Sequence, residues 1–562
     1  MLRKKPLLFI LVILTLFSVY SVSIGVATPN QRPKIKIGAL GPLAITPGND
    51  MKNGVEMAVD EINSGDGVNV GGVIYDFELI TRTTSGDLGI PDPSVGVASA
   101  VQLIDSDNVT AIIGGFRTEV VLGVQMSTSV SLDRPFLGIG ASAPIVSPHF
   151  WRIGPSNVSG LARNVIDFYA YGLIPDEGVR NITIIRESAA WTLAMALGIK
   201  QACIGLAAAG FYGAGVTVNF TDDIIIPVDY QQDEVTNAFS VLTGDTYQGL
   251  ELNALCTIFS GPVGGYVPVA WAAHDLPMFL AGINVESQVS TFFDETEGAC
   301  YGEIELETCP PDVEPNENTA PFRAKYFSLY DEQPTYTAFA SYDAVYVLKA
   351  AIEAANSLNY ADIETALANI EVQGTAYTIK FTSEPGPHWT VAENTTTGLP
   401  YYVPILTSAE YPEGVPIGTF LVHDLYTNAS YGMSGRPYNV GYWAQWQQGG
   451  IKKTIWHDPT KDAPGYLDVY SPMDNQRNLT AGNLVWPINH AEHGWEPEPE
   501  PTTEVTTGVT ETITTEGTET TEEETTTSEE PVVEVPGFDL QIALFVMCSV
   551  AVIFYKQKQK KR

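Results

Sequence analysis

Short apolar runs alternate with amphipathic stretches along residues 34–139, and most of the runs stop at a glycine. Runs rich in β-branched and aromatic residues predict strands, and apolar residues at helical spacing predict helices. On this basis we predict strands at 34–40, 73–81, 111–113 and 136–139, and helices at 51–62, 94–105 and 119–131. Strands that alternate with helices at this spacing predict a doubly wound parallel α/β sheet.

The same pattern begins again after residue 156 and predicts a second, similar lobe. The expected helices are 161–171 and 193–209, and the expected strands are 182–186, 215–220, 254–259 and 277–281. Helices at 342–355 and 362–370, followed by a strand at 377–381, complete the pattern. We therefore predict two doubly wound parallel-sheet lobes.

Residues 112–144 contain two successive strand-to-loop units whose loops would lie side by side at the opening of one binding site. Each apolar run stops at glycine and then offers hydroxyl and backbone N–H groups. In an open parallel sheet, ligands bind beyond the carboxyl ends of the strands. The stretch therefore predicts a capture site for a small molecule.

Composition narrows the class of protein. A chain of 562 residues exceeds the usual size of a single core, and a hydrophobic content of 44% is ample for two. The formal net charge of −37 argues against nucleic-acid binding, because phosphate binding needs clustered Lys and Arg.

Apolar segments stand near both ends of the chain. Residues 1–27 place Arg3, Lys4 and Lys5 before an apolar run and then small residues, which is typical of a secretory signal peptide. An uncleaved membrane anchor is the alternative. Residues 540–555 form a second apolar segment, which we interpret as a transmembrane segment, and the basic residues 556–562 after it predict a cytoplasmic tail.

Residues 494–536 separate the body from this segment and are rich in Thr and Glu, with almost no large apolar side chain after Trp495. Such a composition cannot bury enough surface to fold, so we predict a disordered stalk. The body is predicted to be exported and glycosylated, because seven Asn-x-Ser/Thr sequons lie between the two apolar segments, at Asn108, Asn157, Asn181, Asn219, Asn394, Asn428 and Asn478.

Pro536, Gly537 and Phe538 stand just before the second apolar segment. This order resembles the archaeal sorting signals named for Pro-Gly-Phe, although Asp539 and Gln541 depart from them. The resemblance implies that the segment is cut and the stalk attached to a lipid. Otherwise the segment remains a membrane helix.

Two of the five cysteines, Cys300 and Cys309, enclose a short stretch of acidic and polar residues. In an oxidising compartment they could close a disulfide, and we predict one. Cys203 and Cys256 stand in apolar runs and are interpreted as core residues.

Several segments in order carry a family resemblance: IKIGALGPL and NGVEMAVDEIN within 35–63, then 111–115, GIGASAP at 138–144, and SYDAVYVLKAAIEAA at 341–355. They resemble the leucine/isoleucine/valine-binding family of solute-binding proteins with the type I periplasmic-binding fold. The family implies two lobes, joined by three crossovers, that close over a ligand. A closing piece at 442–456 is displaced by an insertion.

The resemblance implies a division of the chain. Lobe 1 would comprise 33–156 and 302–371, and lobe 2 would comprise 157–301 and 372–480, with 394–439 as the insertion. The crossovers would lie near residues 154–157, 298–302 and 371–374.

The family motif also assigns ligand-binding residues. Thr118 matches the hydroxyl residue of the first loop, and Ala141 with Ser142 matches the backbone and hydroxyl donors of the second. Such donors at a helix start attract an anion. Simple helix capping is the alternative for Thr118 and Ser142.

On the second lobe, Trp191 stands where the family keeps an aromatic residue that covers the ligand, with a plain core tryptophan as the alternative. The family often has an acid after the strand equivalent to MFLAG, to accept the ligand's ammonium group. Here Asn284 follows that strand and Glu286 is the nearest acid, so we assign both to the site.

Arg117 departs from the motif beside Thr118. An arginine can hold a carboxylate through two parallel hydrogen bonds, which predicts an anion anchor. An ion pair with Glu119 or a place at the rim is the alternative. Because Arg117 would add this anchor, the family resemblance does not imply that the ligand is leucine.

No enzyme signature is complete. His490 and His493 lack the HExxH spacing, and the GASA sequence at 140–143 does not complete GxSxG. We therefore predict a solute-binding receptor that captures an amino acid or a similar small polar solute and delivers it to an ABC-type permease, with no enzymatic activity, cofactor or metal. The alternative is a sensory or adhesion ectodomain with the same fold.

Overall fold

The computed structural model describes residues 32–456 apart from 87–89, 144, 146, 243–245, 383–388, 394–399, 405–423, 426–440 and 448. The predicted signal peptide, stalk, transmembrane segment and tail lie outside the described residues. Most of the predicted insertion lies outside them as well.

The first lobe is built on a six-stranded sheet with the order β2-β3-β1-β4-β5-β6. Neighbouring strands are parallel except β2 and β3, which form an antiparallel pair. The predicted strands at 111–113 and 136–139 are confirmed as β4 and β5. The strands are β1 (Lys34–Gly41), β2 (Val68–Val70), β3 (Val73–Thr83), β4 (Ala111–Gly115), β5 (Phe136–Ile139) and β6 (Phe150–Gly154).

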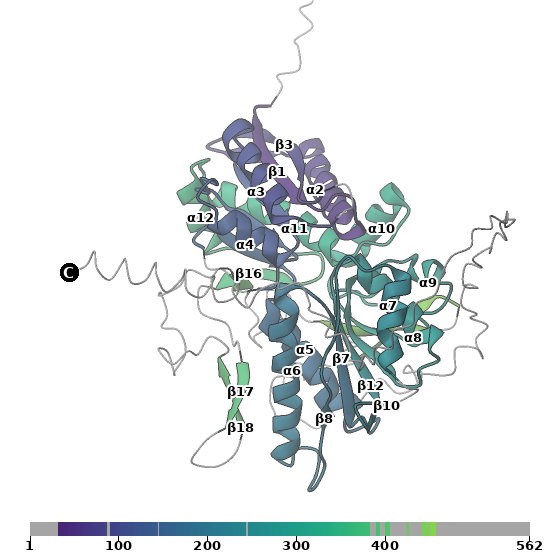
Figure 1. Cartoon of the computed structure of the whole chain (residues 1–562). Helices are drawn as coiled ribbons and strands as arrows, with labels where there is room; N and C mark the ends of the chain where they lie inside the picture. Colours follow the sequence, from purple (N-terminus) through teal and green to yellow (C-terminus); the bar gives the residue numbers. More distant parts are fainter. Residues whose placement is uncertain are drawn as a thin grey trace, which may run out of the picture. The chain divides into compact units, whose positions relative to one another are not determined.

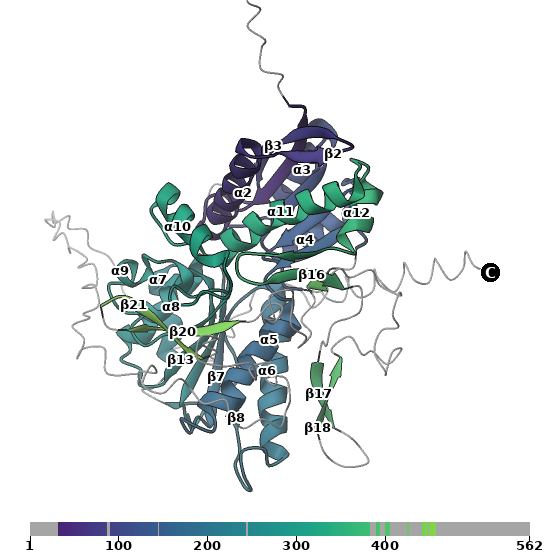
Figure 2. The same cartoon turned by 180° about the vertical axis from the view of Figure 1, so that it is seen from behind.

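Helices cover both faces of this sheet because its strands are apolar on both faces. Ile113 and Leu137 belong to a core that includes α2 and α11, whereas their neighbours Ile112 and Phe136 pack with α3 and α4. Figures 1 and 2 show α11 among the N-terminal elements although it is far from them in sequence. These helices are α2 (Thr46–Ser64), α3 (Pro93–Val101), continued by a π-helical turn at Gln102–Ser106, α4 (Thr118–Met126), α10 (Thr319–Tyr330), α11 (Tyr336–Ala355) and α12 (Tyr360–Leu367).

The contact between α2 and α11 depends on a glycine. A Cβ atom on Gly54 would lie 2.3 Å from Ser341 Oγ and 2.5 Å from the carbonyl oxygen of Ala338, so only glycine lets the two helices approach this closely. The hydroxyl of Tyr342 in α11 also donates a 2.5 Å hydrogen bond to the carboxylate of Glu61 in α2. The contact fixes the C-terminal helices onto the first lobe.

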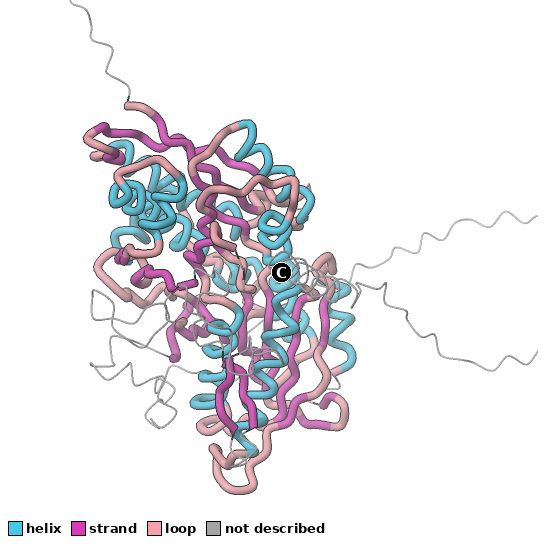
Figure 3. The backbone as a smooth tube through the Cα atoms, turned by 90° about the vertical axis from the view of Figure 1, so that its left-hand side faces the viewer, coloured by secondary structure: helices cyan, strands magenta, loops and turns pink. Residues whose placement is uncertain are grey.

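The second lobe is built on an eight-stranded sheet with the order β21-β20-β14-β13-β12-β7-β8, and β9 also pairs with β7. Figure 3 shows strands, in magenta, with helices, in cyan, beside them. The strands from β14 to β8 are parallel, but β20 and β21 are antiparallel to their neighbours, so the sheet is mixed rather than purely parallel as predicted. The strands are β7 (Asn181–Glu187), β8 (Asn219–Phe220), β9 (Ile224–Ile226), β12 (Ala254–Phe259), β13 (Phe279–Asn284), β14 (Ile304–Glu307), β20 (Tyr442–Gln447) and β21 (Ile451–Trp456).

Two pairs of helices sandwich this second sheet. Ile184 and Ile258 pack with α5 and α6, whereas Ile185 and Leu255 pack with α7 and α8. Among the described helices, α6 alone is long and apolar enough to cross a membrane by length and composition, yet its Met195 is fully buried in the lobe. The helices are α5 (Val158–Phe168), continued by a π-helical turn at Tyr169–Leu173, α6 (Ala190–Ala208), α7 (Gln232–Ala238), α8 (Tyr266–Ala273) and α9 (Phe292–Glu295).

The short elements complete the described chain. Three single turns of 3₁₀-helix stand at Phe239–Val241, Pro262–Gly265 and Val285–Gln288. The short strands are β10 (Thr246–Tyr247), β11 (Leu250–Glu251), β15 (Glu371–Gln373), β16 (Thr378–Thr382), β17 (Trp389–Glu393), β18 (Pro400–Pro404) and β19 (Asp424–Leu425). The hairpin of β17 and β18 lies next to α6 (Figure 1).

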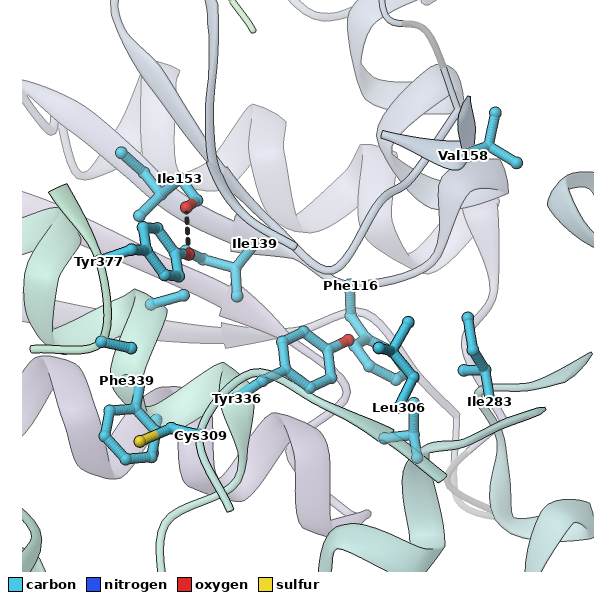
Figure 4. Packing of buried hydrophobic residues seen from close by; sticks show 14 of the residues in the cluster. Phe116, Ile139, Ile153, Val158, Ile283, Leu306, Cys309, Tyr336, Phe339 and Tyr377 are labelled. Atoms are coloured by element: carbon cyan, nitrogen blue, oxygen red, sulfur yellow. Dashed lines mark hydrogen bonds between the residues drawn. The ribbon is translucent and has the colours of Figure 1, made fainter. Parts of the chain in front are cut away.

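The chain passes between the lobes later than predicted at two places. β14 pairs with β13, so residues 302–307 continue the second lobe, and the chain returns to the first lobe only with α10. β16 packs beside β6, where the hydroxyl of Tyr377 donates a 2.7 Å hydrogen bond to the carbonyl oxygen of Ile153 (Figure 4). Residues 372–382 therefore lie on the first lobe instead of the second.

The predicted disulfide between Cys300 and Cys309 is not formed, and both are buried free thiols. The residues between them include strand β14, which we interpreted as part of a polar loop. Four residues of strand span about 13 Å, whereas disulfide-bonded Cα atoms lie within about 7 Å. Cys300 packs against Trp446, and Arg323 lies 3.1 Å from the sulfur of Cys309. Cys203 and Cys256 are buried core residues, as predicted.

The position of β20 in the second lobe yields a test. The ring of Trp443 stacks on Phe168 of α5 with 4.1 Å between ring centroids, and both side chains are fully buried. We expect Trp443→Ala to lower the free energy of unfolding by about 3–5 kcal/mol, because it removes a large buried side chain. Urea denaturation followed by circular dichroism measures this. The control is Ile451→Ala in the adjacent strand β21, where the side chain is 52% exposed. Equal losses in both variants would contradict the packing.

Candidate functional site

A cavity of ≈ 60 Å³ lies where the ends of β4 and β5 face the ends of β7, β12 and β13. Both lobes line it, and Figure 4 shows Phe116 and Tyr336 of the first lobe close to Ile283 and Leu306 of the second. The lining consists of Phe116, Arg117, Thr118, Gly140, Ser142, Pro155, Ser156, Leu161, Asn164, Trp191, Ser260, Ile283, Val285, Gln288, Leu306, Glu307, Thr308, Tyr336 and Gly441.

The wall on the first lobe is made by the two loops that the sequence singled out. Phe116 has a left-handed backbone with φ of 59°, and its N–H donates a 2.8 Å hydrogen bond to the carbonyl of Ile139. A Cβ atom on Gly140 would lie 2.6 Å from the Cα of Phe116, so the second loop needs glycine there. The loops therefore brace each other, and a strained residue stands at the cavity, where such residues tend to cluster.

Thr118 and Ser142 both line the cavity and are almost completely buried. Thr118 is the first residue of α4, and its Oγ1 accepts a 3.4 Å hydrogen bond from the N–H of Ala143. Its hydroxyl thus links the two loops and caps no helix. Ala141 stands behind this wall in the hydrophobic core and does not line the cavity.

Arg117 also lines the cavity, but its guanidinium is paired. Its Nη1 lies 3.1 Å from Glu187 Oε1 and its Nε lies 3.6 Å from Glu119 Oε2. Burial alone would lower the pKa of Arg117, but these two carboxylates outweigh burial and raise the pKa. The ion pair with Glu119, which the sequence left open, is present, and it is joined by a second acid that the sequence analysis did not identify.

That second acid, Glu187, is the last residue of β7 and is fully buried. Its Oε1 accepts hydrogen bonds from Arg117, from the hydroxyl of Ser260 at 2.6 Å and from the indole N–H of Trp191 at 3.2 Å. Its Oε2 accepts a 3.0 Å bond from the N–H of Gly261. A carboxylate at the carboxyl end of a predicted parallel strand was the signal that could have identified it.

Trp191 lines the cavity from the first turn of α6 and is 6% exposed. Its indole ring also belongs to the hydrophobic core, so the core and cavity interpretations both apply. A second link between the lobes lies next to it, because Glu119 Oε1 accepts a 2.8 Å hydrogen bond from the N–H of Ala190.

Asn284 and Glu286, the predicted acceptors for an ammonium group, do not line the cavity, although Ile283 and Val285 do. The amide of Asn284 is fully buried and donates to the carbonyl of Gly264 and to Glu303. Burial raises the pKa of Glu286 to about 7, and Glu295, Glu187 and Asp50 add to the rise.

Glu307 is the acid that lines the cavity. It ends β14 and forms an ion pair with the buried Lys452 of β21, which also lies 2.7 Å from Glu305. Burial would lower the pKa of Lys452, but the two carboxylates outweigh burial and raise it. The described residues include no group of three or more His, Cys, Asp and Glu that could hold a metal ion.

Residues 21–219 match the sequence model of the family described as periplasmic binding protein. This part of the chain is similar to periplasmic binding proteins. The family consists of solute-binding proteins, which agrees with the prediction that the chain is not an enzyme. No curated protein matches the chain.

Solved structures are similar over most of the body. The leucine-binding protein LivK of Thermotoga maritima has a TM-score of 0.50 at 15% identity, covering 66% of this chain and 97% of that one. Isoleucine-bound LivJ of Streptococcus pneumoniae has 0.49 at 14%, covering 66% and 99%. A benzoate-bound solute-binding protein of an ABC transporter from R. palustris has 0.48 at 16%, covering 70% and 97%. The likeness to LivK shows the two-lobed α/β fold.

Glu303, which accepts hydrogen bonds from Asn284 and Ser287, yields a test by pH. Burial raises its pKa to about 7, although hydrogen bonds from Asn284 and Ser287 oppose the rise. Because the folded state holds the proton more tightly than the unfolded state, this contribution to stability is complete below pH of about 4.3 and disappears as the pH approaches about 7. In Glu303→Gln the side chain keeps its shape but does not titrate.

We therefore expect the free energy of unfolding of Glu303→Gln to fall less between about pH 5 and pH 8 than that of the parent, by on the order of 3 kcal/mol. Denaturation in urea at the two pH values measures the difference. Glu251→Gln, which changes an exposed acid of β11, should follow the parent. Parallel curves for Glu303→Gln and the parent would refute the expectation.

Proposed function

We propose that this protein is an extracytoplasmic solute-binding protein that captures an amino acid or a similar small polar solute between its lobes and delivers it to an ABC-type permease. The observation that carries the proposal is the cavity between facing strand ends, with hydroxyl groups on one lobe and a carboxylate on the other. A cavity of ≈ 60 Å³ suits a small solute, because a single water needs about 10–15 Å³ on this scale.

The lining provides for each part of an amino acid. Thr118 Oγ1 accepts from a backbone N–H and so retains its own proton to donate to a ligand carboxylate, beside the hydroxyl of Ser142. Lys452 pairs with Oε1 of Glu307, so the other carboxylate oxygen would accept from an ammonium group. Phe116, Leu306 and Trp191 supply apolar surface for a side chain. The roles of Arg117, Ala141, Asn284 and Glu286 in this scheme are indirect, because Arg117 is paired and the other three do not line the cavity.

Binding would follow hinge closure. A ligand held by the loops of the first lobe gains its contacts with Trp191 and Glu307 only when the lobes meet, so it stabilises the closed state by that difference. Arg117 and Glu119 already join the lobes through Glu187 and Ala190. Because these contacts already favour the closed state, a ligand needs to supply less binding free energy to close the lobes.

We also propose that residues 540–555 anchor the protein at the membrane, as an intact helix or until they are exchanged for a lipid. The support is the order of a Thr-rich segment, Pro-Gly-Phe, an apolar run and a basic tail in the sequence. Mass spectrometry of the protein from its native membrane distinguishes the two forms by the presence of the tail peptide.

A ligand panel tests the proposed function on the full-length protein. Amino acids, amides, short peptides, aromatic acids and sugars are added at millimolar concentration, and the thermal midpoint is recorded. A solute that binds only the folded protein raises the midpoint. A panel in which no compound shifts the midpoint would refute the proposal.

Thr118 gives the sharper test with the best ligand of that panel. We expect Thr118→Val to weaken binding about tenfold or more, because a hydrogen bond to a charged group is lost at almost constant shape. Thr118→Ser should retain most of the affinity. Isothermal titration measures both, with Thr365→Val on the exposed face of α12 as the control. Unchanged affinity in Thr118→Val would remove the residue from the site.

A further inference from the structure

The charges on the cavity wall are compensated from within the protein. Among the described residues that line the cavity, Arg117 carries the permanent positive charge and Glu307 the carboxylate. Arg117 is paired with two acids, Glu119 and Glu187, and Glu307 is paired with Lys452. The described residues of the wall therefore present no unpaired positive charge that could receive an anion.

Glu187 is held as a bound anion would be. Its carboxylate receives the guanidinium of Arg117 at 3.1 Å, the hydroxyl of Ser260 at 2.6 Å, the indole N–H of Trp191 at 3.2 Å and the backbone N–H of Gly261 at 3.0 Å. The four donors come from three segments and from both lobes. Charge-assisted bonds of this kind are the strong ones in a buried site.

We propose that Glu187 is a built-in counter-anion that fills a carboxylate-binding site at the edge of the ligand cavity, and that it thereby selects neutral or zwitterionic solutes over anionic ones. The inference rests on the proposed solute-binding function. An anionic ligand could use Arg117, Ser260 and Trp191 only by displacing a carboxylate that is covalently part of β7. A zwitterion can use the hydroxyls of Thr118 and Ser142 instead, with its ammonium group near Glu307.

The proposal predicts that removing the carboxylate opens an anion site. Glu187→Ala leaves the four donors in place with space for a small carboxylate, so added formate or acetate should replace the missing group. We expect either salt to raise the thermal midpoint of Glu187→Ala by several degrees over sodium chloride at equal ionic strength. The parent protein and Glu251→Ala, which loses an exposed acid elsewhere on the same lobe, should show no such difference.

A double variant shows whether the added anion occupies this site. In Arg117→Met/Glu187→Ala the guanidinium is absent, so the apparent affinity for acetate should fall at least tenfold relative to Glu187→Ala. Equal acetate responses in the single and double variants would overturn the proposal, as would a folded Glu187→Ala that responds to carboxylates no more than Glu251→Ala does.

Glu187→Gln provides the readout if Glu187→Ala does not fold, because it keeps the shape and removes only the charge. We expect it to bind benzoate at least tenfold more tightly than the parent protein, by isothermal titration, while its affinity for a zwitterionic amino acid changes less. No gain in benzoate binding would overturn the proposal. A gain of anion binding in a protein that binds no solute in its native form would support this inference and refute the proposed function, so the two can fail separately.

Discussion

A carboxylate removed from water must be surrounded by donors, and this requirement at Glu187 organises the centre of the molecule. The donors that satisfy it come from the end of β4, the loop after β12 and the first turn of α6. Each of these segments also lines the cavity. The electrostatic demand of one buried side chain therefore fixes how the strand ends of both lobes are placed around the cavity.

The same physical chemistry explains the C-terminal strands. β14 carries Glu305 and Glu307, both buried, which would be untenable without a counter-charge. Lys452 of β21 supplies that charge from beyond the predicted insertion. The stack of Trp443 on Phe168 adds apolar burial at the same edge. A long excursion of the chain can thus be tolerated because its return is specified by both charge and packing.

Much of the first lobe could be predicted from the sequence, since its strands are apolar runs that end at glycine, and these patterns determine β4, β5 and the loops with Thr118 and Ser142. Trp191 was assigned through the family resemblance, from its place after the first predicted strand of the second lobe. β14 could not be predicted in this way, because two glutamates in four residues, directly after Glu303, have the composition of a polar loop. Its ion pairs with Lys452 join residues that are far apart in the sequence, so no local pattern predicts them. The same error produced the expected disulfide. Asn284 and Glu286 were assigned from the family motif, and that assignment left out Glu307.

Helix α6 begins at the cavity, where Ala190 is hydrogen-bonded to the first lobe, and it runs for 19 residues along the second lobe. A helix of that length extends about 28 Å and behaves as a stiff rod. A rotation of the lobes by about 10° at the hinge would move the far end of such a rod by about 5 Å. The change in position between an open and a closed state is therefore larger at the far end of this helix than at the cavity itself.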